Sequence, residues 1–205
     1  MDTKIRDHWQ NVYASRQPEE VSWTQEVPQT SIDFIRSYQL PKTARIIDIG
    51  GGDSRLVDYL VKEGFENVTV LDISSLALER AKVRLGIDAA RVNWIVCDIT
   101  QFEPPVKYDV WHDRATFHFL TTPAQISEYL SRARKAVTGY ITIGTFSESG
   151  PDKCSGLVIR KYSEEQLTRE LSNGFEKIKC ITEDHKTPFN TLQNFLFCSF
   201  RRKSA

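Results

Sequence analysis

The middle of the chain alternates between short apolar runs and longer stretches in which apolar residues recur at helical spacing. The short runs are rich in β-branched residues and predict strands, and the longer stretches predict amphipathic helices. The predicted elements cover, in order, residues 44–49, 53–63, 67–71, 75–86, 92–97, 107–112, 122–137 and 139–146. Alternation of this kind predicts an α/β fold, with a doubly wound parallel sheet covered by helices on both faces.

Both ends of the chain depart from this alternation. Residues 4–14 predict an amphipathic helix, and a second one begins at about Gln29. Residues 174–184 and 191–201 predict two strands joined by a turn, with apolar side chains on both faces of the second strand. We therefore expect helices before the alternating core and an antiparallel hairpin after it.

A glycine-rich turn follows the first predicted strand. The stretch Asp48-Ile49-Gly50-Gly51-Gly52-Asp53-Ser54 links this strand to a helix. Glycines let the backbone take positive φ and admit a ligand where a Cβ would block it, and the first amides of the helix face that ligand. A dinucleotide-binding turn has a third glycine where this chain has Arg55. The Asp48 carboxylate would also repel a pyrophosphate, whereas it suits a cation such as the α-amino group of a methionine moiety.

Acidic residues end three successive predicted strands. Asp48 ends the first, Asp72 ends the second, and Asp98 ends the third, with Ile99 after it. Asp72 stands where a carboxylate binds ribose hydroxyls, and Asp98 stands where a carboxylate meets an adenine amino group. The three acids together predict a site for S-adenosylmethionine (SAM). The alternative is that they are ordinary helix N-caps and solvated loop residues.

At these residues the chain resembles the class I SAM-dependent methyltransferases, and the resemblance covers nearly its whole length. It is most similar to the methyltransferase-like branch that includes translation elongation factor lysine methyltransferases. The resemblance rests on the N-terminal tryptophan segment, the turn from Asp48 to Ser54, Leu71-Asp72-Ile73-Ser74, and Asp113-Arg114-Ala115-Thr116-Phe117. Two departures concern the last segment: Arg114 stands where the relatives have lysine, and histidines flank the segment.

The resemblance implies a seven-stranded, mostly parallel, Rossmann-like sheet with a C-terminal antiparallel hairpin, and SAM as the cofactor. It also implies that the N-terminal segment folds over the cofactor as a lid that excludes water, with Trp9 and Trp23 in it. The alternative is that both tryptophans only pack. With the segment folded over the cofactor, we expect Arg16, between the tryptophans, to reach the cofactor carboxylate. The alternative is that Arg16 is a solvated surface residue. The expected cofactor-binding residues are Trp9, Arg16, Trp23, Asp48, Gly50, Gly51, Gly52, Ser54, Asp72, Ile73, Asp98, Ile99 and Asp113.

A second polar cluster, His112-Asp113-Arg114, lies at the end of the fourth predicted strand, which is adjacent to the first strand at the switch point of such a sheet. We expect His112, Asp113 and His118 to be catalytic, because such groups can hold and deprotonate an amine near neutral pH. The alternative is that Asp113 and Arg114 pair with each other or with neighbours and that His118 only packs. The residues expected at the methyl acceptor are Arg114, Phe117, Cys154, Arg160, Tyr162 and His185.

Composition adds few constraints. Lys plus Arg and Asp plus Glu both number 27, so that no net charge steers the chain toward nucleic acid or an anionic membrane. No apolar run approaches the roughly 20 residues that a membrane helix requires, and residues 1–6 lack an apolar signal core. The four cysteines show no metal-type spacing, which predicts no metal site and free thiols in a reducing compartment.

These observations predict a cytoplasmic protein that is a monomer or a weak homodimer. At 205 residues the chain is long enough for one domain, residues 1–205, with a helical cap at residues 1–40 and a core at residues 41–205. We expect a SAM-dependent methyltransferase, and the resemblance puts a protein lysine narrowly ahead of a small-molecule N, O or S atom as the acceptor. Two other interpretations remain, a SAM-binding protein without turnover and a nicotinamide dehydrogenase; Arg55 and the C-terminal hairpin argue against the latter.

Overall fold

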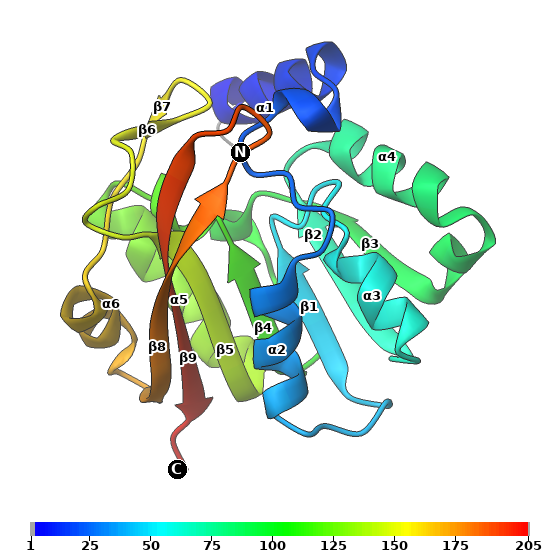
Figure 1. Cartoon of the computed structure of the whole chain (residues 1–205). Coiled ribbons are helices and arrows are strands. Elements are labelled where there is room, and N and C mark those ends of the chain that lie inside the picture. Colours follow the sequence, from blue (N-terminus) through cyan, green and yellow to red (C-terminus); the bar gives the residue numbers. More distant parts are fainter. Residues whose placement is uncertain (1–2, 205) are drawn as a thin grey trace.

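A seven-stranded sheet with the order β3-β2-β1-β4-β5-β9-β8 runs through the protein, whose residues 3–204 are described by a computed structural model (Figure 1). The first five strands are parallel to one another, and β9 is antiparallel to both β5 and β8. The strands are β1 (Arg45–Ile49), β2 (Asn67–Asp72), β3 (Val92–Val96), β4 (Tyr108–Arg114), β5 (Val137–Phe146), β8 (Phe175–Lys186) and β9 (Leu192–Arg202). Because the chain passes from β3 to the far side of β1, the switch point lies between β1 and β4.

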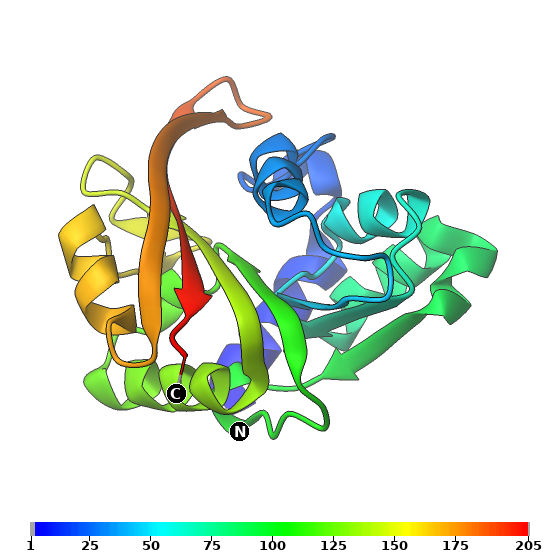
Figure 2. The ribbon, with the colours of Figure 1, turned by 90° about the horizontal axis from the view of Figure 1, so that it is seen from below.

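Helices cover both faces of this sheet (Figure 2). One face carries α2 (Gln29–Ser37), α3 (Leu56–Lys62) and α4 (Ser75–Leu85), and the other carries α5 (Pro123–Ala136) and α6 (Glu164–Leu171). Successive strand residues point to opposite faces, so Ile46 packs under α2 and α3 whereas Ile47 and Trp111 pack under α5. Short 3-10 turns complete the connections: η1 (Pro18–Glu20), η2 (Gly86–Arg91), η3 (Ile99–Gln101) and η4 (Phe117–Phe119).

The predicted fold class is confirmed, and the predicted elements agree with the observed ones to within a few residues. The helix predicted from residue 122 begins after Thr122, whose side chain caps the helix N-terminus with Gln125 in a capping box. The largest difference of functional interest is β4, which continues to Arg114 instead of ending at residue 112. The polar cluster at residues 112–114 therefore lies on a regular strand, where neighbouring side chains point in opposite directions.

Helix α1 (Thr3–Ser15) lies across the carboxyl ends of the parallel strands (Figure 1). Gln10 tethers it there, because its side-chain oxygen accepts hydrogen bonds from the Ser74 hydroxyl at 2.7 Å and the Leu76 amide at 3.2 Å. Helix α2 instead packs on the sheet, and the Tyr38 ring that follows it stacks on Tyr140. The division into a cap and a core stays a prediction, and its terminal residues 1, 2 and 205 lie outside the described part of the chain.

Two further pairs of strands complete the fold. The long segment after β5 folds into a small hairpin of β6 (Lys153–Cys154) and β7 (Leu157–Val158). The C-terminal hairpin of β8 and β9 places Cys180 opposite Cys198, and a disulfide joins them, with a Cα–Cα distance of 4.1 Å. The prediction of four free thiols is therefore wrong, because it did not include the register of this hairpin. Between residues 3 and 204, no helix combines the length and apolar character needed to cross a membrane.

Candidate functional site

The turn between β1 and α3 can only be made by glycine. Gly50 and Gly52 have φ values of +62° and +51°, a region that side chains with a Cβ disfavour. A Cβ on Gly50 would also lie 1.7 Å from the Thr116 hydroxyl oxygen, and one on Gly52 would lie 2.5 Å from the Tyr13 hydroxyl. The Thr116 hydroxyl donates to the Ile49 carbonyl at 3.2 Å, which joins the turn to the segment after β4. The turn is therefore packed closely on two neighbouring segments.

A cavity of about 280 Å³ opens at the carboxyl ends of β1, β2 and β3, under α1. It collects residues that the sequence predicted for the cofactor, namely Trp9, Trp23, Gly50, Asp72, Ile73, Asp98 and Ile99. Arg114 and Cys154, predicted for the acceptor, line the same cavity. We call it the main cavity.

Asp72 is the buried acid in the wall of the main cavity. Its Oδ1 atom accepts a hydrogen bond from the Ser74 amide at 2.7 Å. Burial raises the pKa of this carboxyl to about 7, and the nearby Asp53 and Asp48 charges raise it further against the opposing effect of the backbone amides. Hydrogen bonds donated by ligand hydroxyl groups stabilise such a buried carboxyl. Asp98 behaves differently, since its Oδ1 atom caps η3 by accepting from the amide and hydroxyl of Thr100.

A smaller cavity of about 130 Å³ adjoins the main cavity. Both are lined by the same short set of residues, Tyr13, Trp23, Gly50, Arg114 and Ala115, which therefore form the wall between them. The smaller cavity adds Asp48, Gly51, Ser54 and His112 from the predicted site. We call it the turn cavity, because it lies against the glycine turn.

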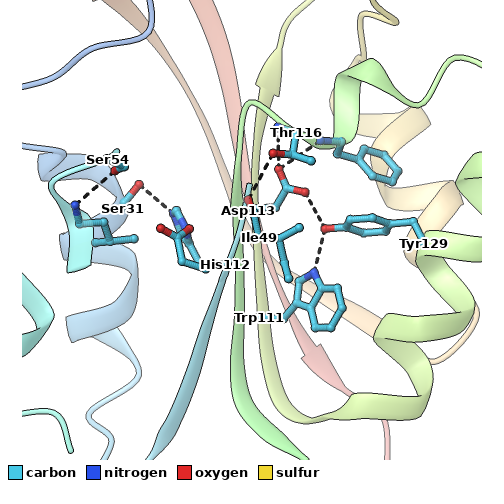
Figure 3. Close-up of polar contacts among 11 residues, drawn as sticks. Ser31, Ile49, Ser54, Trp111, His112, Asp113, Thr116 and Tyr129 are labelled. Carbon is cyan, nitrogen blue, oxygen red and sulfur yellow. Dashed lines mark hydrogen bonds and ion pairs between the residues drawn. The ribbon is translucent and has the colours of Figure 1, made fainter. Parts of the chain in front are cut away.

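His112 is the middle residue of a buried chain of hydrogen bonds. Its Nδ1 atom lies 2.7 Å from Asp48 Oδ1, and its Nε2 atom lies 2.8 Å from the Ser31 hydroxyl, so both ring nitrogens are hydrogen-bonded (Figure 3). All three residues are buried. The arrangement positions the Asp48 carboxylate at the wall of the turn cavity and engages both ring nitrogens of His112.

Asp113 points to the opposite face of the sheet, toward α5 (Figure 3). Its Oδ1 atom accepts from the amides of Thr116 and Phe117, and its Oδ2 atom accepts from the Tyr129 hydroxyl at 2.8 Å. The Tyr129 oxygen accepts in turn from Trp111 Nε1 at 2.8 Å. Asp113 is completely buried and lines neither cavity. Its predicted contact with cofactor and acceptor is therefore replaced by a structural task, the anchoring of the segment after β4.

Three further predicted residues lie in the core behind the cavity wall. His118 stacks on Phe146 with ring centroids 4.6 Å apart, and neither of its ring nitrogens has a hydrogen-bond partner among the described residues. Burial and the Arg114 charge lower the pKa of His118 to about 3, so it stays neutral. Phe117 and Tyr162 pack against each other and are also fully buried. None of the three lines either cavity, because Phe117 and Tyr162 pack under α5 and α6 and His118 packs on Phe146.

Arg16, Arg160 and His185 lie outside both cavities. Arg16 is exposed beyond the end of α1. Arg160 forms an ion pair with Glu170 at 2.9 Å. His185 Nε2 donates to the Ser22 carbonyl at 2.7 Å, which ties the C-terminal hairpin to the N-terminal segment. The structure thus gives Arg160 and His185 packing partners where the sequence predicted contact with the acceptor.

Tyr13 is the main site residue that the sequence analysis did not select. It lines both cavities, and burial together with the Asp72 and Asp53 charges raises the pKa of its hydroxyl well above the ordinary value. The ring lies four residues after Trp9 on the same helical face, and the two rings contact each other and Trp23. The apolar spacing of this helix therefore placed Tyr13 on the same face as Trp9, but it could not distinguish a packing residue from a site residue.

Comparison with known proteins agrees with this geometry. Residues 47–139 match the family described as methyltransferase domain. The chain is 32% identical over 105 residues to malonyl-[acyl-carrier protein] O-methyltransferase of Anoxybacillus flavithermus. The aligned region covers 50% of this chain and 39% of that protein. It is 25% identical over 117 residues to mouse eEF1A lysine and N-terminal methyltransferase, covering 57% of this chain and 16% of that protein. The chain thus spans less than half the length of these relatives.

Solved structures extend the similarity to the whole fold. One is the Burkholderia thailandensis 1,6-didemethyltoxoflavin-N1-methyltransferase with S-adenosylhomocysteine, at a TM-score of 0.72 and 19% identity over 98% of this chain and 88% of that one. Its likeness extends to β8 and β9, which lie outside the family match. Residues 47–139 are therefore similar to a methyltransferase domain, and the solved structures show that the whole chain shares the fold of these enzymes.

Proposed function

We propose that the protein binds SAM across the main and turn cavities and transfers its methyl group to an acceptor. The observation that carries this proposal is the meeting of the glycine turn, the buried Asp72 and Asp98 in one cavity. Asp72 and Asp98 suit the ribose hydroxyls and the adenine of an adenosine moiety. Gly50 and Asp48 suit the charged amino-acid end, since the turn lets a ligand reach the backbone and Asp48 offers a carboxylate.

When it is bound, SAM supplies an activated methyl group, so the task of the protein is to align the reactants and exclude water. Trp9, Tyr13 and Trp23 cover the site from the N-terminal side, and the Trp23 ring packs edge to face on the other two. Gln10 holds this cover against the start of α4. The N-terminal segment therefore shields the reacting groups from solvent, as a closed lid does.

The relatives do not agree on the acceptor. Their names include an O-methyltransferase and enzymes that methylate lysine or a protein N-terminus. The sequence resemblance puts a protein lysine first and a small molecule second, and both stay predictions. The cytoplasmic location and the monomeric or weakly dimeric state are likewise part of this proposal.

Incubation with SAM carrying a tritiated methyl group in a soluble lysate tests the proposed activity. The lysate is separated into protein and small-molecule fractions before counting, and binding of S-adenosylhomocysteine is measured by calorimetry. We expect label in one fraction, and we expect Asp72→Asn to weaken binding at least about tenfold, the effect of one lost hydrogen bond to a buried charged group. Asp88→Asn is the matched control, because the Asp88 side chain is half-exposed and lines neither cavity.

The outcomes separate the alternatives. Binding without label in either fraction favours a SAM-binding protein without turnover. Absence of binding together with a change in NADH fluorescence favours a nicotinamide dehydrogenase. Wild-type affinity in the Asp72→Asn variant would remove this residue from the cofactor site.

A further inference from the structure

Arg114 is a cation at the junction of the two cavities. It is the last residue of β4 and lines both the main and the turn cavity. Its side chain makes one hydrogen bond within residues 3–204, from Nη2 to the Trp23 carbonyl at 2.7 Å. The other arginines of the turn cavity have carboxylate partners: Arg84 pairs with Asp58 at 2.7 Å, and Arg55 pairs with Glu26 at 3.3 Å.

The environment of Arg114 makes the lack of a carboxylate partner significant. Burial lowers the pKa of its guanidinium to about 10, so the group is still charged at neutral pH. The Glu183 and Asp48 carboxylates raise this pKa, but neither forms an ion pair with Arg114. A guanidinium has five N–H donors that match a carboxylate with two parallel hydrogen bonds. A partly desolvated cation with unused donors at a cavity wall is therefore suited to an anionic ligand.

The part of the main cavity at Arg114 includes the rings of Trp9, Trp23 and Phe119, since the Trp23 carbonyl binds Arg114 and the Trp9 ring packs on the other two rings. Leu157, Val158, Thr121 and Gln125 also line the main cavity. Asp72 ends β2 and Asp98 follows β3, on the far side of β1 from Arg114. The ligand that fits this part of the cavity has one anionic group and an apolar body.

None of the bases predicted at the strand end lines the main cavity. Both nitrogens of His112 and both oxygens of Asp113 are held in hydrogen bonds, and His118 lies outside the cavities. The Cys154 thiol in the cavity wall has its pKa raised to about 11 by burial, so it does not act as a base either. A nucleophile that is already deprotonated at neutral pH needs none of these groups, and a carboxylate meets that condition.

We propose that the methyl acceptor is an apolar carboxylic acid, bound as its carboxylate by Arg114 and converted to a methyl ester. This inference rests on the proposed function. A carboxylate oxygen forms a bond to the methyl carbon while the bond between that carbon and sulfur breaks, and the electron pair of the broken bond stays on sulfur. The products are the ester and S-adenosylhomocysteine. The negative charge of the acceptor and the positive charge of the sulfonium cancel, and no proton is transferred.

The test uses the full chain, tritiated methyl SAM and a panel of matched acceptors. The acids are decanoic, phenylacetic and indole-3-acetic acid, and the matched amines are decylamine, phenethylamine and tryptamine. Methyl esters release volatile tritiated methanol in alkali, whereas N-methyl products do not. We expect alkali-labile label with at least one acid and no label with the amines.

Variants of Arg114 connect this activity to the proposed residue. Arg114→Met should lower kcat/KM for the acid at least about 100-fold, as expected for loss of charge-assisted hydrogen bonds, and Arg114→Lys should fall between it and the wild type. The exposed Arg91→Met is the control. The dissociation constant for S-adenosylhomocysteine should stay within about threefold of the wild-type value in every variant, which also shows that the variants fold.

Several results would overturn the inference. Labelling of amines but not acids, no labelling of any acid while S-adenosylhomocysteine binds, or full acid methylation by Arg114→Met would each do so. A loss of S-adenosylhomocysteine affinity in Arg114→Met, with affinity for 5′-methylthioadenosine unchanged, would assign Arg114 to the carboxylate of the cofactor instead. Failure of the wild type to bind S-adenosylhomocysteine at all would contradict the proposed function itself.

Discussion

Replacing Asp113 by asparagine tests whether this residue is an anchor or a catalytic group. The carboxylate is buried beneath the segment that follows β4 and accepts three hydrogen bonds, from two amides and the Tyr129 hydroxyl. Asparagine keeps the shape and one oxygen acceptor, but it cannot accept the Tyr129 proton in the same way and carries no charge. If Asp113 acts only through packing, methyl transfer by the variant should stay within about tenfold of the wild type, equivalent to about 1.4 kcal/mol.

The pKa of Asp113 sets the expected effect on stability. Burial raises it from 3.8 to about 6, against the opposing effect of the hydrogen bonds from Tyr129, Thr116 and Phe117. Because the folded pKa lies above the unfolded one, the contribution of this residue to stability is complete below pH 3.8 and is lost as the pH rises through about 6. The total loss is about 3 kcal/mol, of which about 2 kcal/mol falls between pH 4.5 and 7.5.

Urea unfolding of the wild type and Asp113→Asn at these two pH values measures this effect. Asparagine does not titrate, so the wild type should lose about 2 kcal/mol of unfolding free energy relative to the variant between pH 4.5 and pH 7.5. Asp109→Asn, near the other end of β4, is the control, since Asp109 is only half-buried. The reasoning would be refuted by an Asp113→Asn variant that keeps wild-type stability at both pH values and S-adenosylhomocysteine affinity, yet transfers methyl more than about 1000-fold more slowly.

Two further changes test the turn and the hairpin. Gly50→Ala should abolish cofactor binding and destabilise the fold, because the new Cβ would lie 1.7 Å from the Thr116 hydroxyl oxygen. Gly64→Ala is the control, since Gly64 has φ +86° with open space around it and should show only a backbone cost of about 1 kcal/mol. Equal calorimetric affinities of the two variants for the cofactor would contradict this prediction. Cys180→Ser, or reduction of the wild type, should lower the free energy of unfolding by up to about 3 kcal/mol, since the disulfide to Cys198 closes a loop with a sequence separation of 18. Urea unfolding with and without dithiothreitol measures it, and an unchanged midpoint would show that the crosslink contributes nothing.

The cofactor end of the site could be predicted because its residues lie at the ends of predicted strands or directly after them in the sequence. Parallel strands bring their carboxyl ends to one edge of the sheet, so Asp72, Asp98 and Gly50 meet in one cavity once the strands are identified. Hydrophobic periodicity identifies those strands, and it depends only on local sequence. These assignments of cofactor-binding residues await the binding experiments described above.

The acceptor end could not be predicted in the same way. Side chains alternate between the faces of a strand, so Asp113 and Arg114 face opposite sides, and which of them faces the cavity follows from the exact extent of β4. The pattern of residues 107–112 ended the strand two residues early and left both side chains in a loop. Tyr13 could not be predicted as a site residue for a related reason. An apolar helical face has the same sequence pattern whether it covers a protein core or a ligand.

The sequence by itself determined the α/β class, the order of the elements and the glycine turn, because each follows from local periodicity or from a contiguous motif. Only the tertiary structure decided that Asp113 and His118 are buried in the core, that Arg114 faces both cavities, and that Cys180 meets Cys198. These facts depend on register and on packing between segments far apart in the chain. The free energy of burying a charge or pairing two thiols is set by those distant neighbours, and no stretch of sequence contains them.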